Sequence, residues 1–170
     1  MLKIINTLKP FFEDNYRRIN VREYARMQKI SPPTASKKLT GLEKEGVLKV
    51  EKDRQFIYYY ANKESQVFIQ LLRVYWQIQL NNLGFLEELR REYINPTIIL
   101  FGSLSKAETK IDSDIDLALF SPRKKEINLN KYEKALKRKI QILIFKNKEE
   151  VKNKQLLNNI LNGHKLEGGF

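Results

Sequence analysis

The most informative segment of the chain reads Leu100-Phe-Gly-Ser-Leu-Ser-Lys-Ala-Glu-Thr-Lys-Ile-Asp-Ser-Asp-Ile-Asp-Leu117. An apolar run ends at Gly102 and Ser103. Ten residues separate Ser103 from Asp114, and Asp116 follows inside a second apolar run. Residues two apart in a strand face the same side, so the two carboxylates are predicted to converge on one point. Converging carboxylates repel each other unless a cation neutralises them, and hard oxygen ligands favour Mg²⁺ or Mn²⁺.

The residues before this acidic pair predict a phosphate site. Gly102 permits a close approach of the backbone to a ligand. Ser103 and the N-terminus of a helix expected to follow it offer a hydroxyl group and N–H donors. A phosphate site opposite a divalent cation is the arrangement that phosphoryl or nucleotidyl transfer needs.

This pattern resembles the polymerase-β-type nucleotidyltransferase superfamily, in particular its minimal nucleotidyltransferases. The resemblance covers residues 95–170, and Ser113 and Leu117 beside the two aspartates also match. It implies that Asp114 and Asp116 hold Mg²⁺ (or Mn²⁺) and serve catalysis. It also implies that Gly102 and Ser103 bind a nucleoside triphosphate, as ligand or as substrate.

Two positions depart from the family pattern. Ala107 stands where family members often have glycine, and this substitution is expected to stiffen a helix there. In the strand that the family uses for a third carboxylate, Arg138-Lys-Ile-Gln-Ile-Leu-Ile-Phe145, the expected position is taken by Gln141. An amide cannot act as the general base for an attacking hydroxyl, so the sequence predicts nucleotide binding with weak or lost transfer.

The flanking segments predict an α/β architecture of the α+β type, a mixed sheet with flanking helices. Apolar runs of strand length occupy 97–101, 115–120 and 140–145, and Asn95-Pro96 precedes the first of them. The strongly apolar segments 64–80 and 83–94 read as helices. Three parts are expected: an N-terminal domain over residues 1–62, a helical connector over 63–94, and a nucleotidyltransferase-like domain over 95–170.

The N-terminal part reads as three helices and a hairpin. Helices are expected at 2–13, 21–29 and from Pro32 to about Glu45, with Ser31 as N-cap of the third and Gly46 after its end. Strands are expected at 47–50 and 55–60, joined by the charged turn 51–54.

This order resembles the winged helix-turn-helix family, over about residues 1–62. The resemblance implies binding to double-stranded DNA. The third helix would enter the major groove and the hairpin would reach phosphates or a minor groove. The residues expected to contact DNA are Thr34, Ser36, Lys37, Lys38, Lys52 and Arg54. Additional contacts to the DNA backbone are expected from Arg17, Arg18, Arg22 and Arg26.

Composition excludes several other classes. Lysine and arginine exceed aspartate and glutamate by 32 to 20, a net charge of +12, which points to a polyanionic partner. The chain has no cysteine and a single histidine, His164, expected to be solvent-exposed in a C-terminal turn. Disulfides, thiol nucleophiles and multi-histidine metal sites are therefore excluded or disfavoured. No apolar run is long enough to span a membrane and no signal peptide is recognised, so a soluble cytoplasmic protein is expected.

Three functions remain open. The first is a DNA-binding transcriptional regulator whose nucleotidyltransferase-like domain binds Mg–nucleoside triphosphate. The second is an active nucleotidyltransferase that moves a nucleotide to a hydroxyl of a protein or small molecule. The third is an antitoxin-like module that binds a partner protein. The apolar connector and the symmetry typical of such regulators also predict a homodimer.

Overall fold

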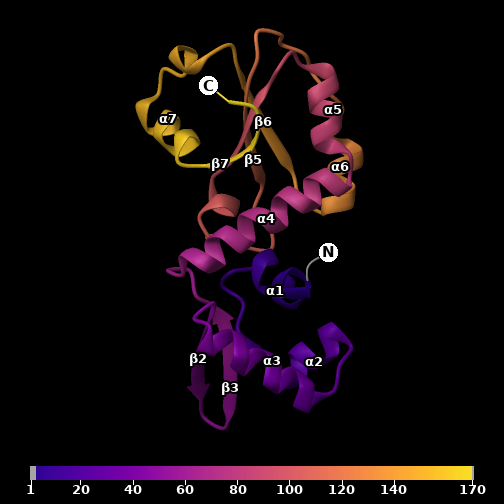
Figure 1. Ribbon diagram of the computed structural model, residues 1–170, viewed down its shortest axis with the longest axis vertical. Helices are drawn as coiled ribbons and strands as arrows, with labels where there is room; N and C mark the ends of the chain where they lie inside the picture. The colour runs from indigo at the N-terminus through magenta and orange to yellow at the C-terminus, as the bar shows by residue number, and fades with distance from the viewer. Residues whose placement is uncertain (1–2, 170) are drawn as a thin grey trace. The chain divides into compact units, whose positions relative to one another are not determined.

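The computed structural model describes residues 3–169 and shows a mixed α and β fold (Figure 1). Within these residues the chain forms seven α-helices and two sheets, and it divides into two compact units. Unit 1 extends to Leu72 and includes Ala107–Ile111, whereas unit 2 contains Arg73–Lys106 and the residues from Asp112 onward. The division falls inside a helix, α4. None of the described helices is long and apolar enough to cross a bilayer.

Unit 1 is built from helices and one small sheet. Its elements are α1 Lys3–Glu13, β1 Ile19–Asn20, α2 Val21–Gln28, α3 Pro32–Lys44, β2 Leu48–Asp53, β3 Phe56–Ala61 and the first part of α4 Gln66–Asn82. The predicted helices and strands are present, except that Leu2, the first residue of the first predicted helix, lies outside the described residues. The two-residue strand β1 pairs with β3 and was not expected from the sequence.

Local signals explain where α3 begins and ends. The Ser31 side chain accepts a hydrogen bond from the N–H of Thr34, as predicted for an N-cap. After the helix, Gly46 adopts φ +72° and its N–H donates to the carbonyl of Glu43 at 2.9 Å. Ala35, Leu39 and Leu42 form the buried face of the helix.

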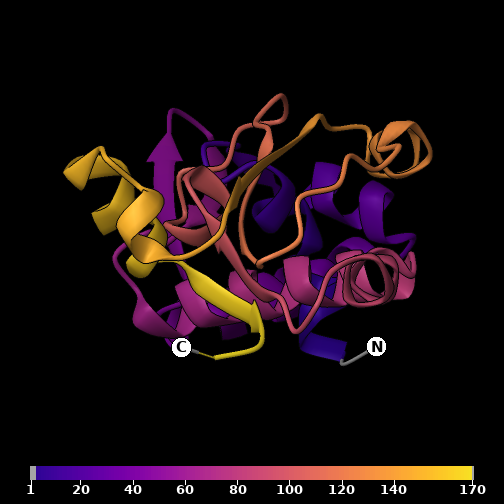
Figure 2. The same ribbon diagram turned by 90° about the horizontal axis from the view of Figure 1, so that it is seen from above.

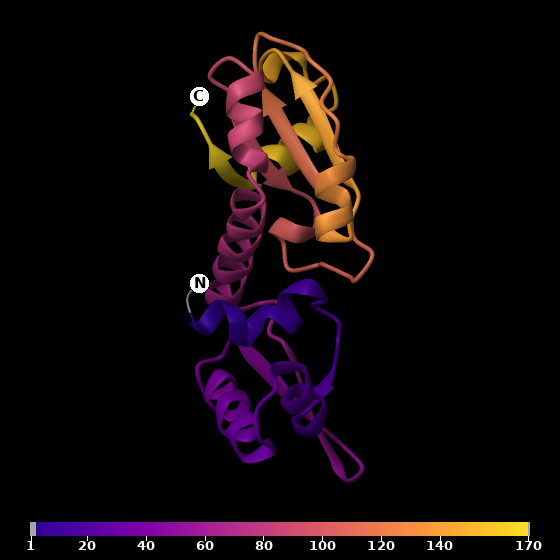
Figure 3. The same cartoon turned by 90° about the vertical axis from the view of Figure 1, so that its right-hand side faces the viewer.

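The β2–β3 hairpin is longer than the sequence suggested. Its strands stay paired out to Asp53 and Phe56, so the turn consists of Arg54 and Gln55 rather than 51–54. Lys52 therefore lies in strand β2, and Arg54 occupies the turn with φ +54°. In Figure 3 the hairpin extends past α2 and α3.

Unit 2 contains a four-stranded sheet flanked by helices. Its elements are the remainder of α4, α5 Phe85–Glu92, β4 Thr97–Phe101, η1 Ser103–Ser105, β5 Ile115–Phe120, α6 Asn130–Leu136, β6 Ile140–Phe145, η2 Lys148–Glu150, α7 Lys154–Leu161 and β7 His164–Glu167. The strand order is β6-β5-β4-β7, with β5 and β6 parallel and the other pairs antiparallel. Figure 2 shows β7 as the yellow arrow at one edge of this sheet.

The central strands β4 and β5 are buried, as their apolar runs predicted. Within unit 2, α7 lies on one side of the sheet and α5 and α6 on the other (Figure 1). The core on the α7 side contains Ile99, Phe101, Ala118, Phe120, Val151 and Ile160. Asp116 shares the face of Ala118 and Phe120 because side chains alternate along a strand. The sheet thus places Asp116 on the α7 side, near the start of β5.

Candidate functional site

The backbone at Gly102 passes directly over the carboxylate of Asp116. Gly102 has φ +71° and ψ −154°, a conformation that residues with a side chain rarely adopt. A Cβ atom at this position would lie 2.3 Å from Oδ2 of Asp116 and 3.2 Å from its Cγ. Glycine is therefore required here for two independent reasons, the dihedral angles and the missing space.

The segment after Gly102 is a short turn and not the helix that the sequence predicted. It consists of the 3₁₀ turn η1, and its Ser105 side chain donates to the carbonyl of Gly102 at 2.9 Å. Arg73, on α4, donates from Nε to the carbonyl of Ser105 at 2.9 Å. A three-residue turn lacks the dipole of a full helix, so phosphate contacts at Ser103 would come from the local loop alone.

Ala107 also lies outside any helix, so the prediction that it stiffens a helix is wrong. It is buried, with φ +57°, the left-handed conformation that favours glycine. This backbone conformation is one that glycine adopts more readily than alanine. The neighbouring Thr109 donates its N–H to Oδ1 of Asn15 at 2.7 Å, and this bond fastens the Ala107–Ile111 segment within unit 1.

The two aspartates interact electrostatically. Asp114 is exposed just before β5, and Asp116 is half-buried inside that strand. Burial raises the pKa of Asp116, and the negative charge of Asp114 raises it further. A divalent cation bound by both carboxylates would relieve this repulsion.

Gln141 stands beside Asp116 on the neighbouring strand. Strands β5 and β6 are parallel, and Asp116 is paired with Gln141 in their register. Paired residues project to the same face of a sheet, and the Gln141 side chain is exposed there. In the part of the chain that the structure describes, no group of three or more His, Asp or Glu side chains could hold a metal ion. The nearby Glu133 instead accepts the N–H of Ile140 at 2.9 Å, at the start of β6.

Arg138 supports the segment that leads into Asp114, a role that the sequence did not reveal. Its side chain is 7% exposed, and Nη1 donates to the carbonyl of Ser113 at 2.6 Å. Its guanidinium carbon lies 5.0 Å from the ring centroid of Trp76. Lys137 and Lys139 on either side are exposed, so no local signal distinguished the buried cation among them.

His164 lies in strand β7 and is half-buried, which corrects its assignment to an exposed turn. Its Nε2 is 3.2 Å from Oε1 of Gln77. Burial lowers the pKa of His164, and the positive charge of Arg73 lowers it further, so the ring is neutral at neutral pH. The structure brings it to α4 and not to the aspartates.

The residues predicted to contact DNA lie on α3 and the β2–β3 hairpin. On α3, Lys37 and Lys38 are exposed and Ser36 is partly exposed, and Lys37 lies opposite the buried face. Thr34 is exposed, but its hydroxyl lies 2.8 Å from that of Ser31 and belongs to the helix cap. Lys52 and Arg54 are exposed near and at the hairpin turn.

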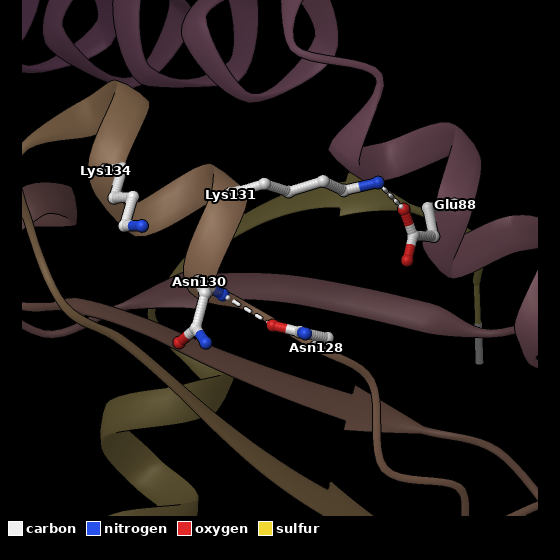
Figure 4. A pocket seen from close by; sticks show the side chains of 5 residues that line it. All are labelled: Glu88, Asn128, Asn130, Lys131 and Lys134. Atoms are coloured by element: carbon white, nitrogen blue, oxygen red, sulfur yellow. Dashed lines mark hydrogen bonds and ion pairs between the residues drawn. The ribbon is translucent and has the colours of Figure 1, made fainter.

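A separate pocket of about 360 Å³ lies between α5 and the start of α6 (Figure 4). Lys131 reaches across it to Glu88 at 2.6 Å, and Tyr132 also donates to Glu88. These bonds lower the pKa of Glu88 and stabilise its carboxylate. Since Lys131 is already neutralised, the pocket has less attraction for an anion than its lysines suggest. It is lined by Glu88, Asn128, Asn130, Lys131 and Lys134.

Comparison with known proteins supports one of the two domain predictions. Residues 84–166 match the protein family described as "Nucleotidyltransferase domain". A nucleotidyltransferase domain is therefore present in this part of the chain, as the Gly-Ser and Asp-x-Asp pattern predicted. The match begins within the segment read as a connector and includes α5. No curated protein and no solved structure matches the chain.

Proposed function

We propose that the chain is a DNA-binding regulator whose nucleotidyltransferase domain binds Mg–nucleoside triphosphate, with weak or lost transfer. The observation that carries this proposal is the contact between Gly102 and Asp116. The backbone of Gly102 lies against the carboxylate of Asp116, which also interacts with Asp114. A side chain at position 102 would not fit there, and this is the place where a metal-bound phosphate would approach. Gly102 and Ser103 would bind the phosphates.

The donor set fits a hard divalent cation such as Mg²⁺ or Mn²⁺. Asp114 and Asp116 would supply carboxylate oxygens, and the amide oxygen of Gln141 lies on the same face. The bound cation would neutralise phosphate charge and orient the triphosphate. Two carboxylates give less negative charge than three, so affinity for the free cation should be modest.

Weak transfer follows from the chemistry of Gln141. Its amide cannot accept a proton from an attacking hydroxyl, whereas a carboxylate in that position can. General-base assistance contributes about 10²–10⁴-fold to a rate. The domain would then bind its nucleotide without consuming it quickly, as a sensor of nucleotide must.

DNA binding is supported by the order and charge of unit 1. Helices α2 and α3 followed by a hairpin fit a winged helix-turn-helix, and α3 exposes Lys37 and Lys38. Neither lysine forms an ion pair among the described residues, so both are available to phosphates or base edges.

Calorimetric titration of Mg–ATP, Mg–GTP, Mg–CTP and Mg–UTP tests the nucleotide part. Saturable binding of at least one is expected, and it should disappear in Asp114→Ala and in Asp116→Ala. Glu149→Ala, which removes an exposed acid elsewhere in unit 2, serves as the charge-matched control. No binding of any nucleotide contradicts the proposal. Rapid transfer of label from an α-labelled nucleotide to an acceptor would instead favour the active enzyme.

Duplex binding at several salt concentrations tests the DNA part. The Lys37→Ala, Lys38→Ala double variant should bind more weakly and with a shallower salt dependence than the Lys152→Ala, Lys154→Ala control, which loses the same charge. Equal affinities contradict the assignment of α3 as the DNA-contacting helix.

The homodimer expected from the apolar connector is tested by measuring the mass of the protein in solution. A monomer at all concentrations argues against it.

A further inference from the structure

A groove in unit 1 lies between α2 and the turn end of the β2–β3 hairpin. Its volume is about 630 Å³. We call it the α2–hairpin groove. It is lined by Asn20, Val21, Arg22, Arg26, Gln55, Phe56 and Ile57. None of these residues belongs to the nucleotide site or to α3, and Arg22 and Arg26 are the two that were also expected to add contacts to the DNA backbone.

The groove is cationic. Arg22 and Arg26 are exposed and lie one helical turn apart on the same face of α2, and neither forms an ion pair in residues 3–169. Among the acids of this region, Glu23 pairs with Arg17 at 2.8 Å. Arg18 lies 3.2 Å from Glu51 and 3.8 Å from Asp53, so a single arginine is shared by these two acids.

Positive charge continues along the same face of α2. A second groove shares Arg22 and Arg26 and extends to Lys29 and the start of α3 at Pro32. Lys29 is also exposed and without an ion pair in the described part of the chain. A chain-like anion, with charges repeated along its length, fits this row of cations better than a single small ion.

The hairpin side of the groove is apolar. Phe56 is 48% exposed and Ile57 is 47% exposed. Both follow the turn directly, beyond the part of the hairpin that packs on α3 through Tyr59 and Thr40. The Phe56 ring has the Tyr58 ring as a neighbour, with 6.4 Å between the ring centroids, and still leaves about half of the residue exposed. An exposed ring in the same groove as two arginines without ion pairs suits a ligand with both a flat apolar surface and a negative charge.

We propose that the α2–hairpin groove binds an unpaired nucleotide segment of a single-stranded nucleic acid. Phe56 stacks on a base, and Arg22 and Arg26 pair with successive phosphates. In a duplex both faces of a base are covered by its neighbours, so an aromatic platform finds no partner there. This inference goes beyond the proposed function and does not require α3 to bind duplex DNA.

Fluorescence anisotropy with labelled dT12, rU12 and a 12-bp duplex tests the proposal on the full chain. Phe56→Ala should weaken binding of a single strand by about 5- to 150-fold, the range for loss of one stacked base. Phe56→Trp should retain that affinity. The exposure of residue 56 makes folding of both variants expected. The dT12 and rU12 arms distinguish DNA from RNA.

Loss of charge gives a second signature. The Arg22→Ala, Arg26→Ala double variant should reduce the slope of log K against log salt for dT12 by about 1.4, since each phosphate contact with a single strand contributes about 0.7. The Lys152→Ala, Lys154→Ala variant, with the same loss of charge in unit 2, should leave the slope unchanged.

Tryptophan fluorescence of the Phe56→Trp variant tests stacking directly. The native chain has one tryptophan, Trp76, which is buried in unit 2, so a second emission at position 56 reports the groove. Binding of dT12 should quench it, and heparin, a polyanion without bases, should not.

Several outcomes would overturn the proposal. They are absence of single-strand binding, unchanged affinity in Phe56→Ala, equal quenching by heparin, and equal weakening of duplex and single strand in Phe56→Ala. Failure of the proposed duplex function has a different signature, because Lys37→Ala with Lys38→Ala should leave dT12 binding intact.

Discussion

A Cβ atom on Gly102 would lie 2.3 Å from Oδ2 of Asp116, far inside van der Waals contact. The residue that follows β4 and the start of β5 thus fit against each other because Gly102 has no side chain. The same relationship positions the proposed phosphate loop against the proposed metal ligand. Changes at either residue should therefore affect both stability and nucleotide binding.

Gly102→Ala should lower the free energy of unfolding by about 1–3 kcal/mol from backbone strain, with the clash against Asp116 adding to that loss. Mg–nucleotide affinity should fall as well. Chemical denaturation and calorimetry measure the two effects. Gly41→Ala is the matched control. Gly41 lies in α3 with no atom within 4 Å of an added Cβ, so alanine there should stabilise the chain by about 0.5–1 kcal/mol. Equal behaviour of the two variants would contradict the account of Gly102.

Asp116→Asn should stabilise the metal-free protein at neutral pH. Burial and Asp114 raise the pKa of Asp116, so the folded chain holds this proton more tightly than the unfolded chain. The resulting contribution to stability is present in acid and is lost as the pH rises through the raised pKa. The asparagine amide at position 116 cannot ionise, so the variant does not lose this stability as the pH rises.

Urea denaturation in EDTA across a pH series checks this prediction. The advantage of Asp116→Asn should be largest at neutral pH and should shrink below about pH 4. Asp112→Asn, at an exposed residue in the preceding loop, is the control. A gain that is constant across the pH series, or no gain at all, would be inconsistent with the buried carboxylate as its source.

Gln141→Asp should create a stronger cation site. The new carboxylate would stand beside Asp116 on the same face of the sheet, completing a set of three acids with Asp114. Without a cation the added repulsion should lower the melting temperature, and Mn²⁺ or Mg²⁺ should raise it more than in the native protein. Thermal unfolding with and without the cation measures this difference. Gln141→Asn keeps an amide and should respond as the native protein does.

Arg138→Met should lower the free energy of unfolding by about 2–3 kcal/mol. It removes a charged hydrogen bond to the carbonyl of Ser113 and a contact with the Trp76 ring. If Arg138 also positions Asp114, Mg–nucleotide affinity should fall even at temperatures where the variant is fully folded. Arg138→Lys should recover part of both losses. Normal nucleotide affinity in a folded Arg138→Met would limit its role to stability.

Much of the architecture was predictable because its signals are local. The strands at 97–101, 115–120 and 140–145 match their predicted ranges, since each is a short apolar run bounded by polar residues. Capping by Ser31 was likewise visible in a few adjacent residues. The strands β1 and β7 were missed, because two to four residues acquire strand structure only by pairing with a distant partner.

The residue types of the candidate site could also be read from short stretches of sequence, but their arrangement in space could not. Gly102, Ser103, Asp114 and Asp116 were predicted as site residues from their types and spacing, and the prediction that Gln141 replaces a third carboxylate came from the family resemblance. The sequence by itself determined which donors the site contains and which it lacks, because those are properties of single residues. Only the tertiary structure decided that Gln141 pairs with Asp116, that Arg138 is buried against Ser113, and that Phe56 lies exposed beside Arg22 and Arg26. Strand register and side-chain burial depend on contacts between segments far apart in the chain, and no local pattern encodes them.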